Sequence, residues 1–100
     1  MEKEKTEGTG EQVKAFELEN NYPNPFNPET VISYQLPVNS KVTLTVYDIL
    51  GNEVTKLVNE EQEAGNYDVK FSGSRLSSGV YLCRIIAGDF VKTIKMSLVK

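Results

Sequence analysis

The stretch at residues 41–58, KVTLTVYDILGNEVTKLV, constrains the fold most strongly because apolar and polar residues alternate along its first half. Aliphatic residues at every second position are typical of a β-strand with one buried face (Val42, Leu44 and Val46). The turn-forming run DILGN follows, and apolar residues then resume. The stretch therefore predicts a β-hairpin. Because a hairpin alone is marginally stable in water, further strands must cover its apolar face.

Four other segments have the same alternation, at residues 16–20, 30–36, 66–72 and 90–99, and a further strand is predicted at 79–87. The segment 79–87 is apolar on both faces around Arg84, which is typical of a central strand. Seven short strands, regular turn signals and no helical periodicity predict an all-β fold, an immunoglobulin-like antiparallel β-sandwich of about seven strands. The length of 100 residues fits one domain. The inward residues that we expect are Phe16, Leu18, Ile32, Tyr34, Leu36, Tyr67, Val69, Phe71, Tyr81, Cys83, Ile85, Ile94, Met96 and Leu98.

The first 15 residues, MEKEKTEGTGEQVKA, are rich in charge and glycine and contain a single branched aliphatic residue. We expect residues 1–15 to form a mostly disordered linker or added tail, and residues 16–100 to form the domain. The start is charged from its second residue, so it does not resemble a secretory signal, which we expect upstream in a larger parent. The polar run NEEQEAG at 59–65 predicts a loop, and Leu76 predicts an apolar contact within the next crossover.

The run NYPNPFNP at residues 21–28 contains three prolines, which remove three backbone donors and favour extended geometry in the preceding residues. It predicts a rigid crossover between strands. We expect Tyr22 and Phe26 to anchor this crossover on the end of the core. Asn24 and Asn27 precede prolines and are expected to cap turns with their side chains.

Composition excludes several function classes. The chain has no histidine, so it lacks the commonest general base and metal ligand, and its single cysteine forms no disulfide within the chain. A net charge of −3 with interspersed signs argues against nucleic-acid binding. The best apolar run, at 80–87, is interrupted by Arg84 and is too short for a transmembrane helix. We therefore predict no enzyme activity and no catalytic, cofactor-binding or metal-binding residues.

Four features have both a functional and a structural interpretation. The acidic run could bind Ca²⁺ but lacks the spacing of a calcium loop, so a solvated turn is favoured (Glu60, Glu61 and Glu63). Two aspartates could act as an acid–base pair, yet both lie in predicted hairpin turns (Asp48 and Asp89). Cys83 could be a nucleophile but is expected in the core. Aromatic residues could stack on a sugar, although packing is the favoured role (Tyr22, Phe26 and Tyr47).

The last strand has two interpretations that the residues leave open. Three lysines interrupt an otherwise apolar strand (Lys92, Lys95 and Lys100). They fit an edge strand that lysines protect against aggregation. They also fit a basic terminal strand that a receptor binds, by strand addition.

Two segments carry a family resemblance. The stretch NNYPNPFNPETVISYQLP at 20–37 resembles the opening of the type A C-terminal sorting domains of the type IX secretion system. The stretch LSSGVYLCRIIAGDFVKTIKMSLVK at 76–100 is similar to that family's ending, with its Ser-Gly-Val-Tyr start and Lys-Met-x-Leu-x-Lys finish. The hairpin and the strand between them follow the family as well, so the resemblance covers residues 16–100. Cys83 stands where many relatives carry an aromatic residue.

The resemblance implies a non-enzymatic immunoglobulin-like domain at the C-terminus of secreted cargo in Gram-negative bacteria. The parent protein would cross the inner membrane by its own signal peptide, pass through the periplasm, and reach the cell surface or the medium. In many relatives the domain is cleaved off and the parent is attached to the surface. The implied partners are the outer-membrane machinery of the type IX system and an upstream cargo domain of the same chain. The alternative function is a passive accessory module of an extracellular hydrolase, either a spacer or a weak carbohydrate binder.

Recognition by the secretion machinery is carried over residue by residue from the resemblance. The candidates are the Gly-x-Tyr pair and the terminal motif (Gly79, Tyr81, Lys95, Met96, Leu98, Val99 and Lys100). The proline-rich run also matches, but its composition gives it an equally good structural explanation (Tyr22, Pro23, Asn24, Pro25, Phe26, Asn27 and Pro28). Exposed apolar residues beside the terminal strand would add contact area (Val80, Leu82 and Ile86).

Overall fold

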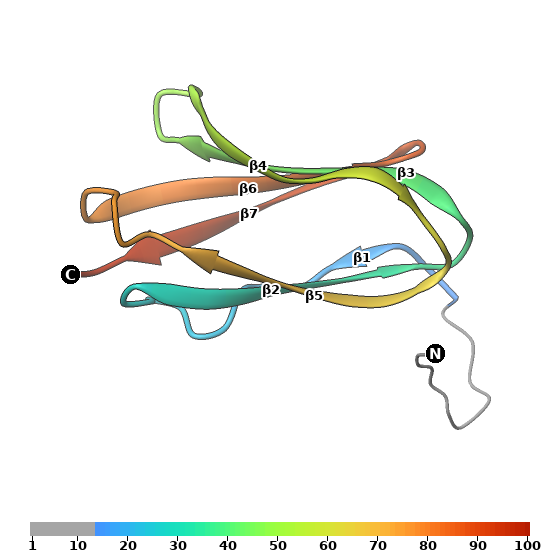
Figure 1. The fold of residues 1–100 in the computed structure, drawn as a ribbon, viewed down its shortest axis with the longest axis horizontal. Coiled ribbons are helices and arrows are strands. Elements are labelled where there is room, and N and C mark those ends of the chain that lie inside the picture. The colour runs from blue at the N-terminus through green and yellow to red at the C-terminus, as the bar shows by residue number, and fades with distance from the viewer. Residues whose placement is uncertain (1–13) are drawn as a thin grey trace.

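The computed structural model describes residues 14–100, which form seven β-strands in two facing sheets (Figure 1). The strands are β1 (Glu17–Leu18), β2 (Glu29–Leu36), β3 (Ser40–Asp48), β4 (Glu53–Gln62), β5 (Gly65–Ser72), β6 (Gly79–Ala87) and β7 (Phe90–Leu98). One sheet has the order β1-β2-β5 and the other the order β4-β3-β6-β7. All neighbouring strands within each sheet are antiparallel. The predicted antiparallel β-sandwich is confirmed.

The core lies between the two sheets and follows from the alternation in the sequence. Alternate residues of a strand point to opposite faces, so each strand gives the core every second side chain. Complete burial of one aliphatic side chain is worth about 1.5–3 kcal/mol. Two stacked aromatic pairs extend the core toward its margins, with ring centroids 5.2 Å apart for Tyr34 and Tyr67 and 5.3 Å apart for Phe16 and Phe90. The buried apolar residues are Leu18, Phe26, Ile32, Tyr34, Leu36, Val42, Leu44, Val46, Phe71, Tyr81, Cys83, Ile85, Ala87, Ile94, Met96 and Leu98.

The strand β6 lies between β3 and β7, so the prediction of a central strand is confirmed. Its inward side chains are buried, and its outward apolar side chains are partly covered by their neighbours. Val80 and Leu82 are half-buried, and Ile86 is 37% exposed. The apolar patch expected beside the terminal strand is therefore only partly exposed.

Two predicted boundaries are wrong. The expected loop at 59–65 is mostly strand, because β4 continues to Gln62. The start of β3 needs a hydrogen-bonded partner, and Ser40 pairs with Gln62 in the register. The first strand spans only Glu17–Leu18, and Phe16 lies just outside it, half-buried against Phe90. Nearly all of the expected linker lies outside the described residues.

The sandwich has two ends, and three turns or strand ends lie together at one of them. The turn between β3 and β4, the start of β6 and the C-terminus all lie at the left end in Figure 1. The registers agree, since Asp48 pairs with Tyr81 and Gly79 pairs with Leu98. None of the described residues forms a helix long and apolar enough to cross a membrane.

Candidate functional site: a proline-rich loop on the terminal strand

The proline-rich loop, residues 21–28, leaves the three-stranded sheet and lies against β7 of the other sheet. Phe26 and Leu98 form a parallel β-bridge. The Phe26 N–H donates to the carbonyl of Ser97 at 2.8 Å, and the Val99 N–H donates to the carbonyl of Phe26 at 3.0 Å. The loop thus covers the outer edge of β7 at its C-terminal end.

The side chain of Asn24 reinforces this pairing. Its Nδ2 donates to the carbonyl of Lys95 at 3.2 Å, and its Oδ1 accepts from the Ser97 N–H at 3.0 Å. An amide side chain offers one donor group and one acceptor group, as a peptide unit does, so it matches the edge of a strand. Asn24 does not cap its own turn as predicted, because its amide binds a strand 71 residues away. We call the Asn24 and Phe26 contacts with β7 the loop clamp.

Phe26 anchors the loop clamp in the core, as predicted. Its side chain is 1% exposed, and its ring lies 5.9 Å from the ring of Phe71. The neighbouring Gly73 leaves the necessary room, because a Cβ there would lie 2.8 Å from Leu98 Cδ2 and 3.4 Å from Phe26 Cε2. The Gly73 N–H also donates to the carbonyl of Pro28 at 2.8 Å, which fixes the end of the loop.

Tyr22 is not an anchor, because its side chain is 80% exposed. Its backbone N–H and carbonyl both bond to Val31, and the preceding residue, Asn21, takes the inward position. Asn21 Nδ2 donates to Thr30 Oγ1 at 3.0 Å and to the carbonyl of Pro23 at 3.2 Å. The Thr30 hydroxyl also donates to that carbonyl, at 2.8 Å. Sequence reasoning missed Asn21 and Thr30. The alternation of the predicted strand at 30–36 was a usable signal for Thr30, which lies two residues before the inward Ile32.

The candidate recognition residues of β6 and β7 are brought together by the sheet. Gly79 pairs with Leu98, and Tyr81 pairs with Met96. Tyr81, Met96 and Leu98 are buried, and the Tyr81 hydroxyl donates to the carbonyl of Ser77 at 2.7 Å. These three side chains belong to the core of the folded domain, so a partner does not reach them there.

The remaining recognition candidates stay accessible. Gly79 and Lys95 are exposed, and Val99 is 52% exposed. Lys100 is exposed as well, but it is held in place: its N–H donates to Ser78 Oγ at 3.1 Å and its Nζ donates to the carbonyl of Ser74 at 2.7 Å. The C-terminus therefore has a defined position beside the loop clamp.

The strand β7 is an edge strand, which both interpretations of its lysines require. Its edge is nevertheless partly covered. The loop clamp hydrogen-bonds the backbone at residues 95–99, and Lys92 forms an ion pair with Glu17 of β1 at 2.8 Å. The hydrogen bond from Lys92 lowers the pKa of Glu17. A partner that added a strand at residues 95–99 would first have to displace the loop.

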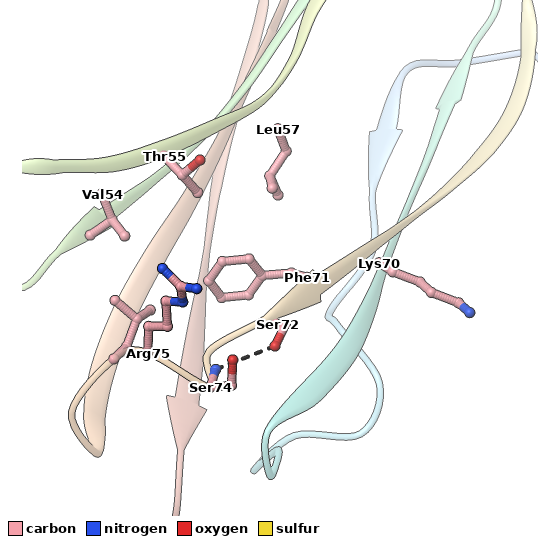
Figure 2. A pocket seen from close by; sticks show the side chains of 9 residues that line it. Val54, Thr55, Leu57, Lys70, Phe71, Ser72, Ser74 and Arg75 are labelled. Carbon is pink, nitrogen blue, oxygen red and sulfur yellow. Dashed lines mark hydrogen bonds between the residues drawn. The ribbon is translucent and has the colours of Figure 1, made fainter.

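An open groove of about 390 Å³ lies between the edges of β4 and β5 (Figure 2). Figure 2 shows the Phe71 ring pointing into it, with Leu57 and Val54 on the opposite strand. The Ser74 N–H donates to Ser72 Oγ at 3.3 Å at its rim. The groove is lined by Val54, Thr55, Leu57, Lys70, Phe71, Ser72, Ser74, Arg75 and Leu76, and it includes none of the candidate recognition residues.

The residues with a possible catalytic role are kept apart. Asp48 lies beside Tyr81 near the start of β6, and Asp89 follows Ala87 at its other end. Tyr81 and Ala87 are about 20 Å apart along the strand at 3.3 Å per residue. The Asp48 carboxylate accepts from the Asn52 N–H at 2.9 Å and the Leu50 N–H at 3.0 Å, and these hydrogen bonds lower its pKa. Cys83 is fully buried, and burial raises the pKa of its thiol to about 12.

The residues considered for a metal site and for a sugar site do not come together in the structure. Within residues 14–100, no three histidine, cysteine, aspartate or glutamate side chains come close enough to hold a metal ion. Glu60 and Glu61 lie on the edge strand β4, not in a turn. Phe26 is buried. Tyr22 lies beside β2 of the three-stranded sheet, whereas Tyr47 is half-buried on the outer face of the four-stranded sheet. The three aromatic residues therefore form no common platform.

Comparison with solved structures shows the fold in another protein. The chain is similar to part of PorZ of Porphyromonas gingivalis, an essential bacterial surface component of the type-IX secretion system, with a TM-score of 0.58 and 18% sequence identity. The match covers 93% of this chain and 12% of the PorZ chain, so this chain spans about an eighth of its structural relative. No curated protein sequence matches the chain.

Comparison with family models gives a match over most of the chain. Residues 20–100 match the model described as a secretion system C-terminal sorting domain. The matched range contains the proline-rich loop, the strand β7 and every contact of the loop clamp. A family of sorting signals indicates a non-enzymatic role. The chain belongs to the family of secretion system C-terminal sorting domains, which are sorting signals of the type IX secretion system.

Proposed function

We propose that the secretion machinery recognises the folded domain through the exposed side chains at the end of β7, which the loop clamp holds in place. The observation that carries this proposal is the loop clamp itself. The two segments with the strongest family resemblance bind each other through Asn24 and Phe26, whose partners lie at least 71 residues further along the chain.

The accessible side chains define the surface. Lys95, Val99 and Lys100 are exposed, whereas Met96 and Leu98 are buried between them. The backbone edge at residues 95–99 is already hydrogen-bonded to the loop. Recognition of the folded domain therefore relies on side chains and on shape, and strand addition at this edge would require the loop to leave first.

The domain acts in this proposal as a label and has no catalytic activity of its own. The domain spans residues 16–100 and follows an upstream cargo domain in the same parent chain. The parent passes through the periplasm and is carried across the outer membrane to the cell surface or the medium, with cleavage of the domain as a later step. The burial of Cys83 and the separation of Asp48 from Asp89 support the non-catalytic part.

The test is an export assay with a fluorescent reporter that carries a signal peptide and ends in residues 16–100. It is made in a bacterium with a type IX system. Deletion of residues 95–100 is a poor test, because it removes Met96 and Leu98 from the core. The sharper variant combines Lys95→Ala, Val99→Ala and Lys100→Ala, all at exposed positions.

A matched control removes exposed lysines from other strands, through Lys56→Ala on β4 and Lys70→Ala on β5. We expect the wild-type and control reporters at the cell surface and the triple variant in the periplasm, with all three domains folded by circular dichroism. Surface delivery of the triple variant at the wild-type level would contradict the proposed recognition surface.

A further inference from the structure

The outer face of the four-stranded sheet carries an arginine without an acidic partner. Arg84 lies in the middle of β6, opposite Thr45 of β3 and Thr93 of β7. Its guanidinium is half-buried and packs against Tyr47, with Cζ 4.9 Å from the ring centroid and Nη2 donating to the hydroxyl at 2.7 Å. Among the described residues it forms no ion pair, and its buried Nε has no hydrogen-bond acceptor.

The surroundings of Arg84 are basic and apolar. By alternation, the outward positions of β3, β6 and β7 include Lys41, Arg84 and Lys95 and no acidic residue. The outward acidic residues of this sheet, Glu53 and Glu61, lie on its fourth strand β4, opposite Tyr47 and Lys41. Apolar residues share this outer face, with Leu82 half-buried opposite Tyr47 and Val91 57% exposed opposite Ile86. Desolvation of a cation is costly unless an anion or a set of acceptors compensates for the lost water.

We propose that this face, centred on Arg84 and bounded by Tyr47, Leu82 and Val91, binds a protein that offers a carboxylate between apolar side chains. The inference rests on the proposed function, since it identifies the partner's chemistry within the secretion machinery. Because Nε is buried and Nη2 already donates to Tyr47, the donors left for a carboxylate are those of Nη1 and the second hydrogen of Nη2, and pre-organisation lowers the entropy lost on binding. The apolar flanks favour a protein surface, because a polyanion would call for a stripe of basic residues.

The most direct test supplies the missing carboxylate from within the domain. Thr93 is exposed and lies directly opposite Arg84, and opposite positions in an antiparallel pair are about 5 Å apart at Cβ. Thr93→Glu would pair with Arg84 and compete with the partner's carboxylate without removing any side chain from the sheet. Thr93→Gln is the matched neutral control, since it has the same shape and no charge.

The readout is the rate at which the reporter described above reaches the cell surface, together with the unfolding temperature of each purified domain. We expect Thr93→Glu to slow export roughly tenfold while Thr93→Gln stays at the wild-type rate. Arg84→Gln should slow export to the same extent, and Lys56→Gln on β4, two strands away from β6, should not.

The outcomes separate the inference from the proposed function. Export of Thr93→Glu at the wild-type rate, or equal slowing by Thr93→Gln, would overturn the role of Arg84 and leave the sorting function standing. A folded wild-type domain that fails to deliver its reporter would overturn the sorting function, and this inference with it.

Discussion

Substitution of Asn24 tests whether the loop clamp stabilises the terminal strand. Asn24→Ala removes two hydrogen bonds to β7, one to the Lys95 carbonyl and one from the Ser97 N–H. Both bonds are exposed to solvent, so each is worth about 0.5 kcal/mol, the low end of the usual net range. Their joint loss of about 1 kcal/mol corresponds to a melting temperature lowered by about 4–8 °C in a domain of this size.

Amide hydrogen exchange gives the local part of this prediction. The Ser97 N–H donates to Asn24 Oδ1, so we expect its exchange to become about fivefold faster in Asn24→Ala, the factor that corresponds to about 1 kcal/mol. Asn27→Ala is the matched control, because Asn27 is an exposed asparagine of the same loop. Unchanged protection of Ser97 in Asn24→Ala, or equal loss in both variants, would refute the reasoning.

Three further predictions concern stability and reactivity. Gly73→Ala should destabilise the domain by about 1–3 kcal/mol in urea unfolding, because its Cβ would lie 2.8 Å from Leu98 Cδ2; a stability equal to wild type would mean that Leu98 yields freely. Cys83 should resist thiol reagents at pH 8 in the folded domain and react in urea, since burial raises its pKa to about 12; fast labelling of the folded domain would contradict its burial. The pKa of Asp48 is lower in the folded domain than its ordinary value of 3.8, so the ionised carboxylate stabilises the fold above pH 3.8, and this stability is lost as the pH falls through the folded pKa. Asp48→Asn should therefore lose less stability on acidification than wild type does. Parallel profiles of stability against pH for the two proteins would refute this assignment.

The alternation of apolar residues was enough to predict most strands and the sandwich. It works where one face of a strand is buried, as for Ile32 in β2 and Leu44 in β3, because burial forces a period of two. It fails at the end of β4, where Glu60 and Glu61 pair with β3 at a solvent-exposed edge. Backbone hydrogen bonds to β3 alone hold these residues in a strand, and such bonds produce no alternation of apolar residues in the sequence.

The loop clamp could be predicted only in part. The prolines and Phe26 predicted a rigid, anchored crossover, and the structure confirms the anchor, since Phe26 is buried and hydrogen-bonded to Ser97 and Val99. The prediction that Tyr22 anchors the loop was wrong, because Asn21 takes the inward position and its Nδ2 donates to the Pro23 carbonyl and the Thr30 hydroxyl. The partner of Asn24 is 71 residues away, and no local pattern identifies such a contact.

The family resemblance reached further than the residue patterns did, but it did not separate buried from accessible positions. It pointed to the terminal motif as a unit, whereas the structure divides that motif. Met96 and Leu98 maintain the core, and Lys95, Val99 and Lys100 remain available to a partner. A recognition role is therefore a property that point substitutions at the exposed positions can test without loss of the fold.

The measurement that tests the central claim most directly is the fraction of reporter at the cell surface for the Lys95, Val99 and Lys100 triple variant, compared with the intact domain. The account predicts that the intact domain delivers its reporter to the surface and that the folded triple variant leaves it in the periplasm. Equal surface fractions, with both domains folded, would contradict recognition through the exposed side chains of the terminal strand.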